Sequence, residues 1–371
     1  MDFKLTDEQQ MLTDTLQRYL QNEYSLTKRN EAAHHSDGFD EKHWATFAEL
    51  GLIGVFFKEE DGGFAGTGFD VSCVFETLGH ALVVEPLADC TLIPGQVLAA
   101  VGATDRLEEI IAGTLRLAVA FDEYNTRYDR SQCATTALQT ADGWVLNGTK
   151  AMVKFANQSD ALIVSARTGE RPDQMSLFLV PCDVGGLSQT CYSLFDGGQA
   201  ADIRLSDVTL PRDALIGERH GGADLIGIAT GWGILAVCAE ALGIMETIKN
   251  VTLEYLRTRK QFGTEIGRFQ ALQHRMAQML LEIEQARSAV INAAAAMEAS
   301  GIERDRMLSA AKYSIGRIGT LVAEEAIQMH GGIGMTWEYD IGHFAKRLSM
   351  IDHEMGDTDY HLSKFIELAA E

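Results

Sequence analysis

The chain has 371 residues, of which 46% are hydrophobic and 23% charged, a balance typical of a globular protein. Its 31 Lys and Arg against 53 Asp and Glu give a formal net charge of −22, which argues against a nucleic-acid partner and against adhesion to an anionic membrane. The length is ample for two or three domains with sizeable cores.

The cysteines and the first residues predict a cytoplasmic protein. None of the six cysteines forms Cys-x-x-Cys or has metal-ligand spacing with a histidine, so we expect free thiols and no metal site. The N-terminus lacks a basic segment followed by an apolar stretch, so we expect no signal peptide. The longest apolar candidate for a membrane span, residues 226–244, carries Glu240 and several glycines, so we expect no span.

Residues 1–115 are predicted to form an N-terminal helical domain. Thr6 followed by Gln9 has the pattern of a capping box, and leucines recur behind it at helical spacing. Two more segments with helical spacing, 43–50 and 70–82, follow before the pattern changes.

Residues 116–222 are predicted to form a middle β-barrel or sandwich. Short apolar or alternating runs are separated by turn signals such as Asn147-Gly148. These runs are 117–121, 134–138, 144–146, 161–166, 177–180 and 203–210.

Residues 223–371 are predicted to form a C-terminal helical bundle. Apolar stripes with the period of a helix run through 272–290 and 307–322. Long stripes of this kind are typical of an antiparallel bundle with faces left for subunit contacts. The whole chain is therefore expected to be an α+β protein.

Two segments at helix ends are candidates for a ligand site. The basic segment 257–263 includes Arg259, which can pair a phosphate, and Phe262, which offers an aromatic wall. The glycine-rich segment 328–336 lets a backbone approach a ribose or pyrophosphate closely. Ordinary helix capping explains both segments equally well from composition alone.

The order and spacing of short motifs resemble those of the acyl-CoA dehydrogenase family over nearly the whole chain. The matching stretches are Phe3-x-Leu-Thr-x-Glu-Gln9, Gly51-Leu-Ile-Gly54, Glu59-Glu-Asp-Gly-Gly63, Trp144-x-Leu-Asn-Gly-x-Lys150, Pro211-x-x-x-x-Ile-Gly217, Arg259-Lys-Gln-Phe-Gly263, Phe269-Gln270 and Gln328-x-x-Gly-Gly-x-Gly334. The resemblance implies an N-terminal helical domain, a middle β-barrel and a C-terminal four-helix bundle, usually assembled as a tetramer. It also implies FAD and an acyl-CoA substrate, from which a carboxylate removes the α proton while FAD takes the β hydride.

The chain departs from this family where the catalytic base is expected. One family position for the base, directly before Gly356, holds Met355, whose thioether cannot accept the α proton. The alternative family position on the long helix corresponds to Gly233. Asp352, Glu354 and Asp357 flank this position and could substitute, with Asp352 and Glu354 as the weak candidates, although acids of so acidic a chain are more often solvated surface groups.

The middle domain departs as well. The family usually has a Gly-Ser that meets FAD, whereas residues 120–129 of this chain contain none. The family often has Trp-Ile-Thr against the flavin ring, where this chain has Met152, Val153 and Lys154. The side chains that contact the flavin are therefore expected to be missing.

The retained residues belong to the half of the FAD site that one subunit of this family offers to its neighbour. We expect this chain to bind the ADP half of FAD with Arg259, Phe262, Gln270, Gln328, Gly331 and Gly332. The chain would then resemble the small, non-catalytic subunit of α2β2 acyl-CoA dehydrogenases of the pimeloyl-CoA or steroid-CoA type, with a homologous catalytic subunit as partner.

Two alternatives stay open at this point. The chain can be a self-sufficient homotetrameric enzyme that uses Asp352 or Glu354 as its base, in which case Lys154 beside the flavin needs an explanation. It can also be a flavin-free protein of the same fold that binds or presents an acyl-CoA.

Overall fold

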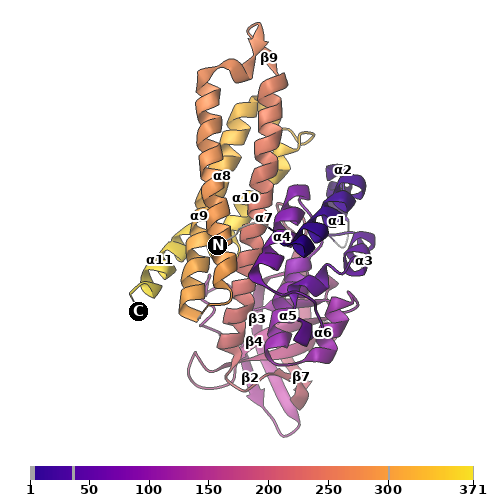
Figure 1. Ribbon diagram of the computed structural model, residues 1–371. Coiled ribbons are helices and arrows are strands. Elements are labelled where there is room, and N and C mark those ends of the chain that lie inside the picture. The colour runs from indigo at the N-terminus through magenta and orange to yellow at the C-terminus, as the bar shows by residue number, and fades with distance from the viewer. Residues whose placement is uncertain (1–4, 36–37, 300, 371) are drawn as a thin grey trace. The chain divides into compact units, whose positions relative to one another are not determined.

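The computed structural model describes residues 5–35, 38–299 and 301–370, which form two compact units (Figure 1). The first unit contains Met1–Arg29, Thr67–Val83 and Ile234–Glu371, and the second contains Asn30–Gly66 and Val84–Gly233. The boundaries predicted for three domains, at 115 and 222, stay a prediction, and neither coincides with a boundary of the two units.

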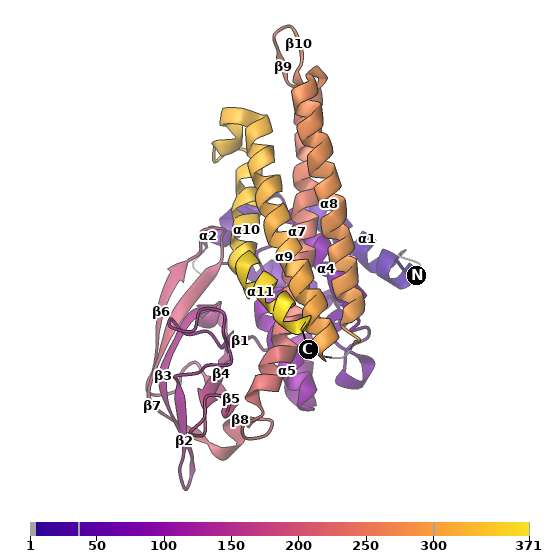
Figure 2. The same ribbon diagram turned by 90° about the vertical axis from the view of Figure 1, so that its left-hand side faces the viewer.

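The first unit is helical. Its helices are α1 (Asp7–Glu23), α4 (Gly68–Ala81), most of α7 (Gly222–Thr258), α8 (Gln270–Ala296), α9 (Gly301–His330), α10 (Ile341–His353) and α11 (Thr358–Leu368). Figures 1 and 2 show α7, α8, α9 and α10 side by side, which confirms the predicted C-terminal bundle. Buried apolar side chains of α8 and α9 follow the two predicted stripes, because each helix packs on the other along one face.

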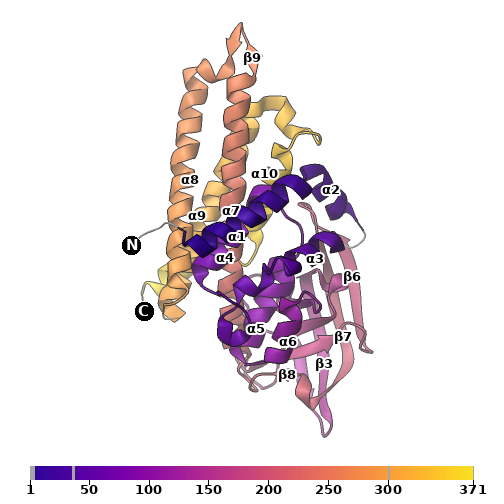
Figure 3. The same ribbon diagram turned by 45° about the vertical axis from the view of Figure 1, so that its right-hand side comes forward.

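Two capping boxes begin helices of the first unit. The hydroxyl of Thr6 accepts from the Gln9 backbone N–H at 3.2 Å, and the Gln9 amide oxygen accepts from the Thr6 backbone N–H at 3.1 Å. Thr67 and Asp70 repeat this arrangement at the start of α4. The predicted N-terminal helix is therefore confirmed, and α1 packs against α4 (Figure 3).

Helices α4 and α7 approach each other so closely that glycine is needed at the crossing. A Cβ at Gly243 would lie 2.0 Å from the carbonyl oxygen of Glu76, and a Cβ at Gly79 would lie 2.1 Å from that of Glu240. Backbone atoms cannot move aside as a flexible side chain can, so both positions exclude a larger residue.

The second unit contains one eight-stranded sheet. Its strands are β1 (Leu117–Ala120), β2 (Thr136–Gln139), β3 (Gly143–Lys154), β4 (Ala161–Arg167), β5 (Met175–Pro181), β6 (Leu187–Ser193), β7 (Gln199–Pro211) and β8 (Leu215–Ile216). They pair in the order β6-β7-β3-β2-β4-β5-β8, and β1 pairs with β4 in parallel. Apolar side chains from six of these strands meet in one buried core, which confirms the predicted middle β domain.

Several strands differ from the prediction, among them β8, which was not predicted, and β7, which begins at Gln199 and not at 203. Strand β3 continues to Lys154, because after Leu146 the chain keeps pairing with β7 across two irregularities in register. Strand β6 was not predicted, since its sequence is polar and most of its side chains are exposed at the sheet edge. Edge strands need no apolar alternation, so periodicity does not reveal them.

Short helices and turns complete the chain. The remaining helical segments are α2 (Leu26–His34), α3 (Glu41–Glu49), η1 (Ile53–Phe56), η2 (Glu59–Asp61), a π-helical turn (Ala88–Leu92), α5 (Ile93–Ala100), α6 (Thr104–Ile111), η4 (Ala156–Gln158), η5 (Arg212–Ala214), η6 (Ile266–Arg268) and η7 (Gly331–Met335). A short hairpin of β9 (Lys260–Gln261) and β10 (Thr264–Glu265) joins α7 to α8.

Helix α7 is the one described helix that is long and apolar enough to cross a membrane by length and composition. Of the 18-residue window with mean hydropathy 1.8, however, 67% is buried inside the structure. That burial is what the core helix of a globular protein shows.

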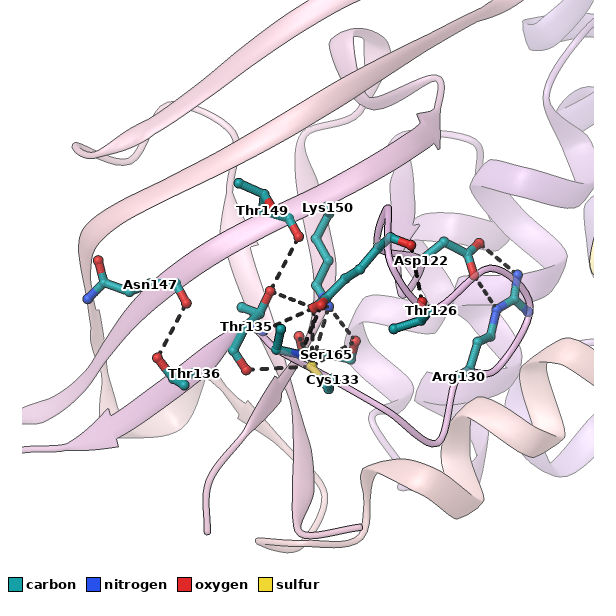
Figure 4. Close-up of polar contacts among 12 residues, drawn as sticks. Asp122, Thr126, Arg130, Cys133, Thr135, Thr136, Asn147, Thr149, Lys150 and Ser165 are labelled. Atoms are coloured by element: carbon teal, nitrogen blue, oxygen red, sulfur yellow. Dashed lines mark hydrogen bonds and ion pairs between the residues drawn. The ribbon is translucent and has the colours of Figure 1, made fainter. Parts of the chain in front are cut away.

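A buried ion pair joins the loop after β1 to strand β3 (Figure 4). The Lys150 ammonium donates to Glu123 Oε1 at 2.7 Å and to Ser165 Oγ at 2.9 Å. Glu123 also accepts from the backbone N–H groups of Ala134 and Thr135. Burial by itself raises the pKa of Glu123, but the charge and hydrogen bond of Lys150 outweigh it and lower that pKa to about 2.

Replacing Gly243 by Ala is expected to lower the free energy of unfolding by about 1–3 kcal/mol, because the added methyl group forces α4 and α7 apart. Gly227→Ala is the matched control on the same helix, since a Cβ there meets nothing within 4 Å. This control should be neutral or stabilise by up to about 1 kcal/mol. Denaturant unfolding of both variants measures the difference, and equal effects would contradict the close crossing.

Replacing Glu123 by Gln is expected to cost about 3–5 kcal/mol of stability, because Lys150 is then buried without a counter-ion. The double variant Glu123→Gln/Lys150→Met should recover part of this loss. Asp173→Asn, which breaks the exposed pair with Arg171, is the control and should change stability by less than about 1 kcal/mol.

The same pair predicts a pH dependence. Because the folded pKa of Glu123 is about 2, below its ordinary 4.5, the pair stabilises the fold fully above pH 4.5 and loses this contribution as the pH falls toward 2. The difference in unfolding free energy between the wild type and the double variant should therefore shrink over that range. A difference independent of pH would show that Glu123 carries no such shift.

Candidate functional site

The turn after α10 holds Met355 at the predicted base position. Met355 is half-buried, with a left-handed backbone at φ 57°, and Gly356 follows it at φ 119°. Its neighbour Glu354 is buried, and the Glu354 carboxylate accepts from Arg347 Nη1 at 2.5 Å. Arg347 also donates to both carboxylate oxygens of Glu240 on α7, at 2.6 and 2.7 Å. Glu354 is therefore held in an ion-pair network inside the first unit.

A buried lysine holds the backbone of this turn. Lys312, on α9, donates from Nζ to the carbonyl oxygen of Asp352 at 3.0 Å and to that of Gly356 at 2.7 Å. His361 Nε2 lies 3.1 Å from the carbonyl oxygen of Met355. Burial, with a smaller contribution from Lys312, lowers the pKa of His361 to about 3, so this ring is neutral and donates.

Asp352, the other predicted substitute, is also engaged. Its Oδ1 accepts from the Thr358 hydroxyl at 2.8 Å, where the chain enters α11. The same oxygen packs on α9, where a Cβ added to Gly316 would lie 2.0 Å away. Gly233, at the alternative base position, is buried in α7 and offers no side chain. The structure thus places a thioether at the predicted base position, beside two carboxylates that already have structural partners.

The predicted ADP-binding residues lie at the ends of bundle helices. Arg259 follows α7 and is exposed, and no described residue forms an ion pair with its guanidinium. Phe262 is 92% exposed, and its ring lies edge-on to that of Phe269 at 6.1 Å. Gln270 is the first residue of α8 and is also exposed.

The glycine-rich segment lies against the end of α7. Tyr255, one turn before Arg259, stacks on His330 with ring centroids 4.4 Å apart and donates its phenol to the His330 carbonyl. His330 ends α9 and directly precedes Gly331 and Gly332, where an added Cβ would meet no atom within 4 Å. Gln328 is exposed in the last turn of α9. The structure therefore brings both predicted segments to one end of the bundle, beside the β9–β10 hairpin (Figure 1).

The loop after β1, where the family has its Gly-Ser, is tied down by ion pairs in this chain. Arg130 pairs with Asp122 through two hydrogen bonds of 2.7 and 2.8 Å (Figure 4). Arg130 also donates to the Thr230 hydroxyl at 2.8 Å, and the Asp122 carbonyl accepts from Ala151 of β3. Together with the Glu123–Lys150 pair, these contacts fold the loop onto its own sheet.

The stretch that would face a flavin ring has other partners. The Met152 backbone N–H donates to Asp202 at 3.1 Å, and Asp202 also accepts from the phenols of Tyr124 and Tyr192. Lys154, which needed an explanation, pairs with Asp89 at 3.5 Å, with both side chains mostly buried. The polar groups of residues 152–154 are therefore engaged with other side chains of this chain.

The sequence did not predict two charge networks. One is the pair of Glu123 and Lys150, and the other joins Arg347 to both Glu240 and Glu354. The family motifs include Lys150 but do not name its partner, which lies 27 residues earlier. Arg347 and Glu240 are 107 residues apart, and no local pattern relates them. A weak signal exists for Glu240, since a carboxylate within a long apolar helix needs a partner when it is buried.

Known proteins match this chain over most of its length. Models of the acyl-CoA dehydrogenase N-terminal, middle and C-terminal domains match residues 6–110, 118–206 and 220–366. The probable acyl-CoA dehydrogenase YngJ of Bacillus subtilis is 30% identical over 382 residues, covering 97% of each chain. The acyl-CoA dehydrogenase FadE12 of Mycobacterium tuberculosis is 28% identical and covers 91% of this chain and 89% of its own length.

Solved structures agree with these matches. A variant of the Tcur3481-Tcur3483 steroid ACAD superposes with a TM-score of 0.88 at 28% identity, covering 98% of each chain. The fold, the sequence motifs and the relatives all agree with one family, and this chain belongs to the acyl-CoA dehydrogenase family.

Proposed function

We propose that this chain is the non-catalytic subunit of a heteromeric, FAD-dependent acyl-CoA dehydrogenase and lends the ADP-binding half of the FAD site to a catalytic partner. The observation that carries the proposal is the turn after α10, where Met355 stands at the base position. A thioether has no basicity with which to accept the α proton of an acyl-CoA.

Neither neighbouring carboxylate is available for that role. A base must lie within hydrogen-bond reach of the proton that it removes. Glu354 is paired with Arg347, and Asp352 is bonded to Thr358, while Lys312 holds the backbone between them. Taking either carboxylate out of this turn would leave buried charges or donors without partners. This argument disfavours a self-sufficient enzyme that uses Asp352 or Glu354.

The residues at the end of the bundle fit the ADP half of FAD. The guanidinium of Arg259 is exposed for pairing with a phosphate, and Phe262 offers a ring face beside it. The open space around Gly331 and Gly332 admits a ligand close to the backbone. When bound, FAD supplies the acceptor for the β hydride. The contacts of Met152 with Asp202, and of Asp122 with Arg130, do not suit the flavin half in this chain.

The comparisons support a partner and a substrate class. The solved relative with 28% identity is a steroid ACAD whose name joins two components, Tcur3481 and Tcur3483. By analogy we propose an α2β2 complex with a homologous catalytic subunit and an acyl-CoA with a bulky acyl group, such as a steroid side chain, as its substrate.

The first test is the flavin content of this chain expressed alone and together with an encoded family member that carries the Glu-Gly and Gly-Ser motifs. We expect no bound FAD in the chain alone and about one FAD per pair of unlike chains in the complex, because each chain holds one half of the site. Absorbance of the purified proteins gives the ratio. One FAD per chain in the solo preparation would contradict the proposal.

Within the complex, Arg259→Ala is expected to weaken FAD retention by about tenfold or more, through loss of a charge-assisted pair with a phosphate. Arg18→Ala removes the same charge from an exposed position on α1 of the same unit and should leave FAD content unchanged. Unchanged FAD content in both variants would show that Arg259 does not bind FAD.

Met355→Ala in the complex is expected to leave turnover nearly intact, because the working base is on the other polypeptide. Turnover of acyl-CoA with an artificial electron acceptor measures this effect, and FAD content and assembly are checked alongside it. A collapse of turnover while both of these are preserved would mean that this turn lines a working acyl site.

A further inference from the structure

A cavity within the first unit is lined by residues other than those assigned to FAD. Its volume is about 480 Å³, within the range of small-molecule sites. It is bounded by α1, the start of α2, α4, α7 and the start of α10, and none of the predicted FAD-binding or acyl-site residues lines it. Every lining residue belongs to the same compact unit.

The floor of the cavity is aromatic and apolar. Tyr24 and Phe344 are buried and offer ring surface, and Leu20 and Val251 add aliphatic surface between them. A flat or branched hydrocarbon body would lose its contact with water on such a floor.

One wall of the cavity carries His80, and the contacts of this ring indicate which of its nitrogens bears the proton. The Thr247 hydroxyl donates its single proton to the carbonyl oxygen of His80 at 3.1 Å. The contact of 3.2 Å between Thr247 Oγ1 and His80 Nδ1 is satisfied together with this bond when the ring proton is on Nδ1. Burial lowers the pKa of His80, so the ring is neutral, and Nε2 is an acceptor.

The rim carries a carboxylate. Asp340 stands at the N-terminal end of α10, but its side chain does not cap that helix. Among the described residues that line the cavity it is the only Asp, Glu, Lys or Arg. An exposed carboxylate, a neutral imidazole acceptor and two aromatic rings form a set that attracts a cation bearing N–H donors.

We propose that this cavity binds an organic ammonium compound, that is, an amine with an aromatic or branched apolar body. The body lies on the floor formed by Tyr24 and Phe344, and the ammonium group donates to Asp340 and to His80 Nε2. The site is independent of the FAD site in its residues and in its ligand charge, since a phosphate would be repelled by Asp340.

Calorimetric titration of the purified chain with tryptamine, tryptophol and indolepropionate tests the proposal, because the three probes share a ring and differ in charge. We expect tryptamine to bind at least about tenfold more tightly than either of the others, as a charge-assisted hydrogen bond is lost in both. Equal affinity of all three probes, or no binding of tryptamine, would overturn it.

Two variants locate the binding. Asp340→Asn should weaken tryptamine binding by about tenfold or more, whereas Glu338→Gln, with the same charge change two residues away, should not alter it. Ala81→Leu should fill part of the cavity and abolish binding while the melting temperature stays near that of the wild type. Binding that survives both Asp340→Asn and Ala81→Leu would place the ammonium elsewhere and refute the assignment.

Discussion

A buried ammonium group needs an acceptor for each of its N–H donors, and this constraint shapes both segments in which this chain departs from its family. Lys150 and Lys312 are fully buried lysines on β3 and α9. Lys150 gathers Glu123, Ser165 and the loop after β1 around its head, and Lys312 gathers the carbonyl oxygens of the turn after α10. Removing either set of acceptors would leave a charge in a medium that solvates it poorly.

The charges around these lysines explain why the departures are stable local structures. In the turn after α10, Arg347 links Glu354 to Glu240, so two carboxylates and one guanidinium satisfy one another beside Met355. In the loop after β1, Arg130 and Asp122 form a similar pair. The charged side chains of these two segments named above are engaged with one another. The proposed role of the chain rests on this contrast with the end of the bundle, where Arg259 and Phe262 are exposed.

The residues proposed for the ADP half of FAD and the altered stretch that would face the flavin lie in different compact units. Every residue proposed for the ADP half, from Arg259 to Gly332, belongs to the first unit, and the altered flavin-facing stretch belongs to the second. The base turn is the exception, since Met355 shares the first unit with the ADP residues. The end of the bundle is held together independently of the turn after α10, because the Tyr255–His330 contact that joins α7 to α9 there involves neither Lys312 nor Arg347.

The sequence by itself determined what depends on neighbours a few residues apart. The capping box at Thr6, the stripes of α8 and α9 and the apolar runs of most strands are local patterns, and so is the absence of a carboxylate at position 355. Tertiary structure alone decided the exposed edge strand β6 and the fate of Glu354 as a partner of Arg347. These depend on pairing between distant segments, whose geometry is set by packing and not by periodicity. The role of an acidic side chain, as a catalytic base or as a member of a structural ion pair, also depends on tertiary structure, because the fold determines which groups lie beside it.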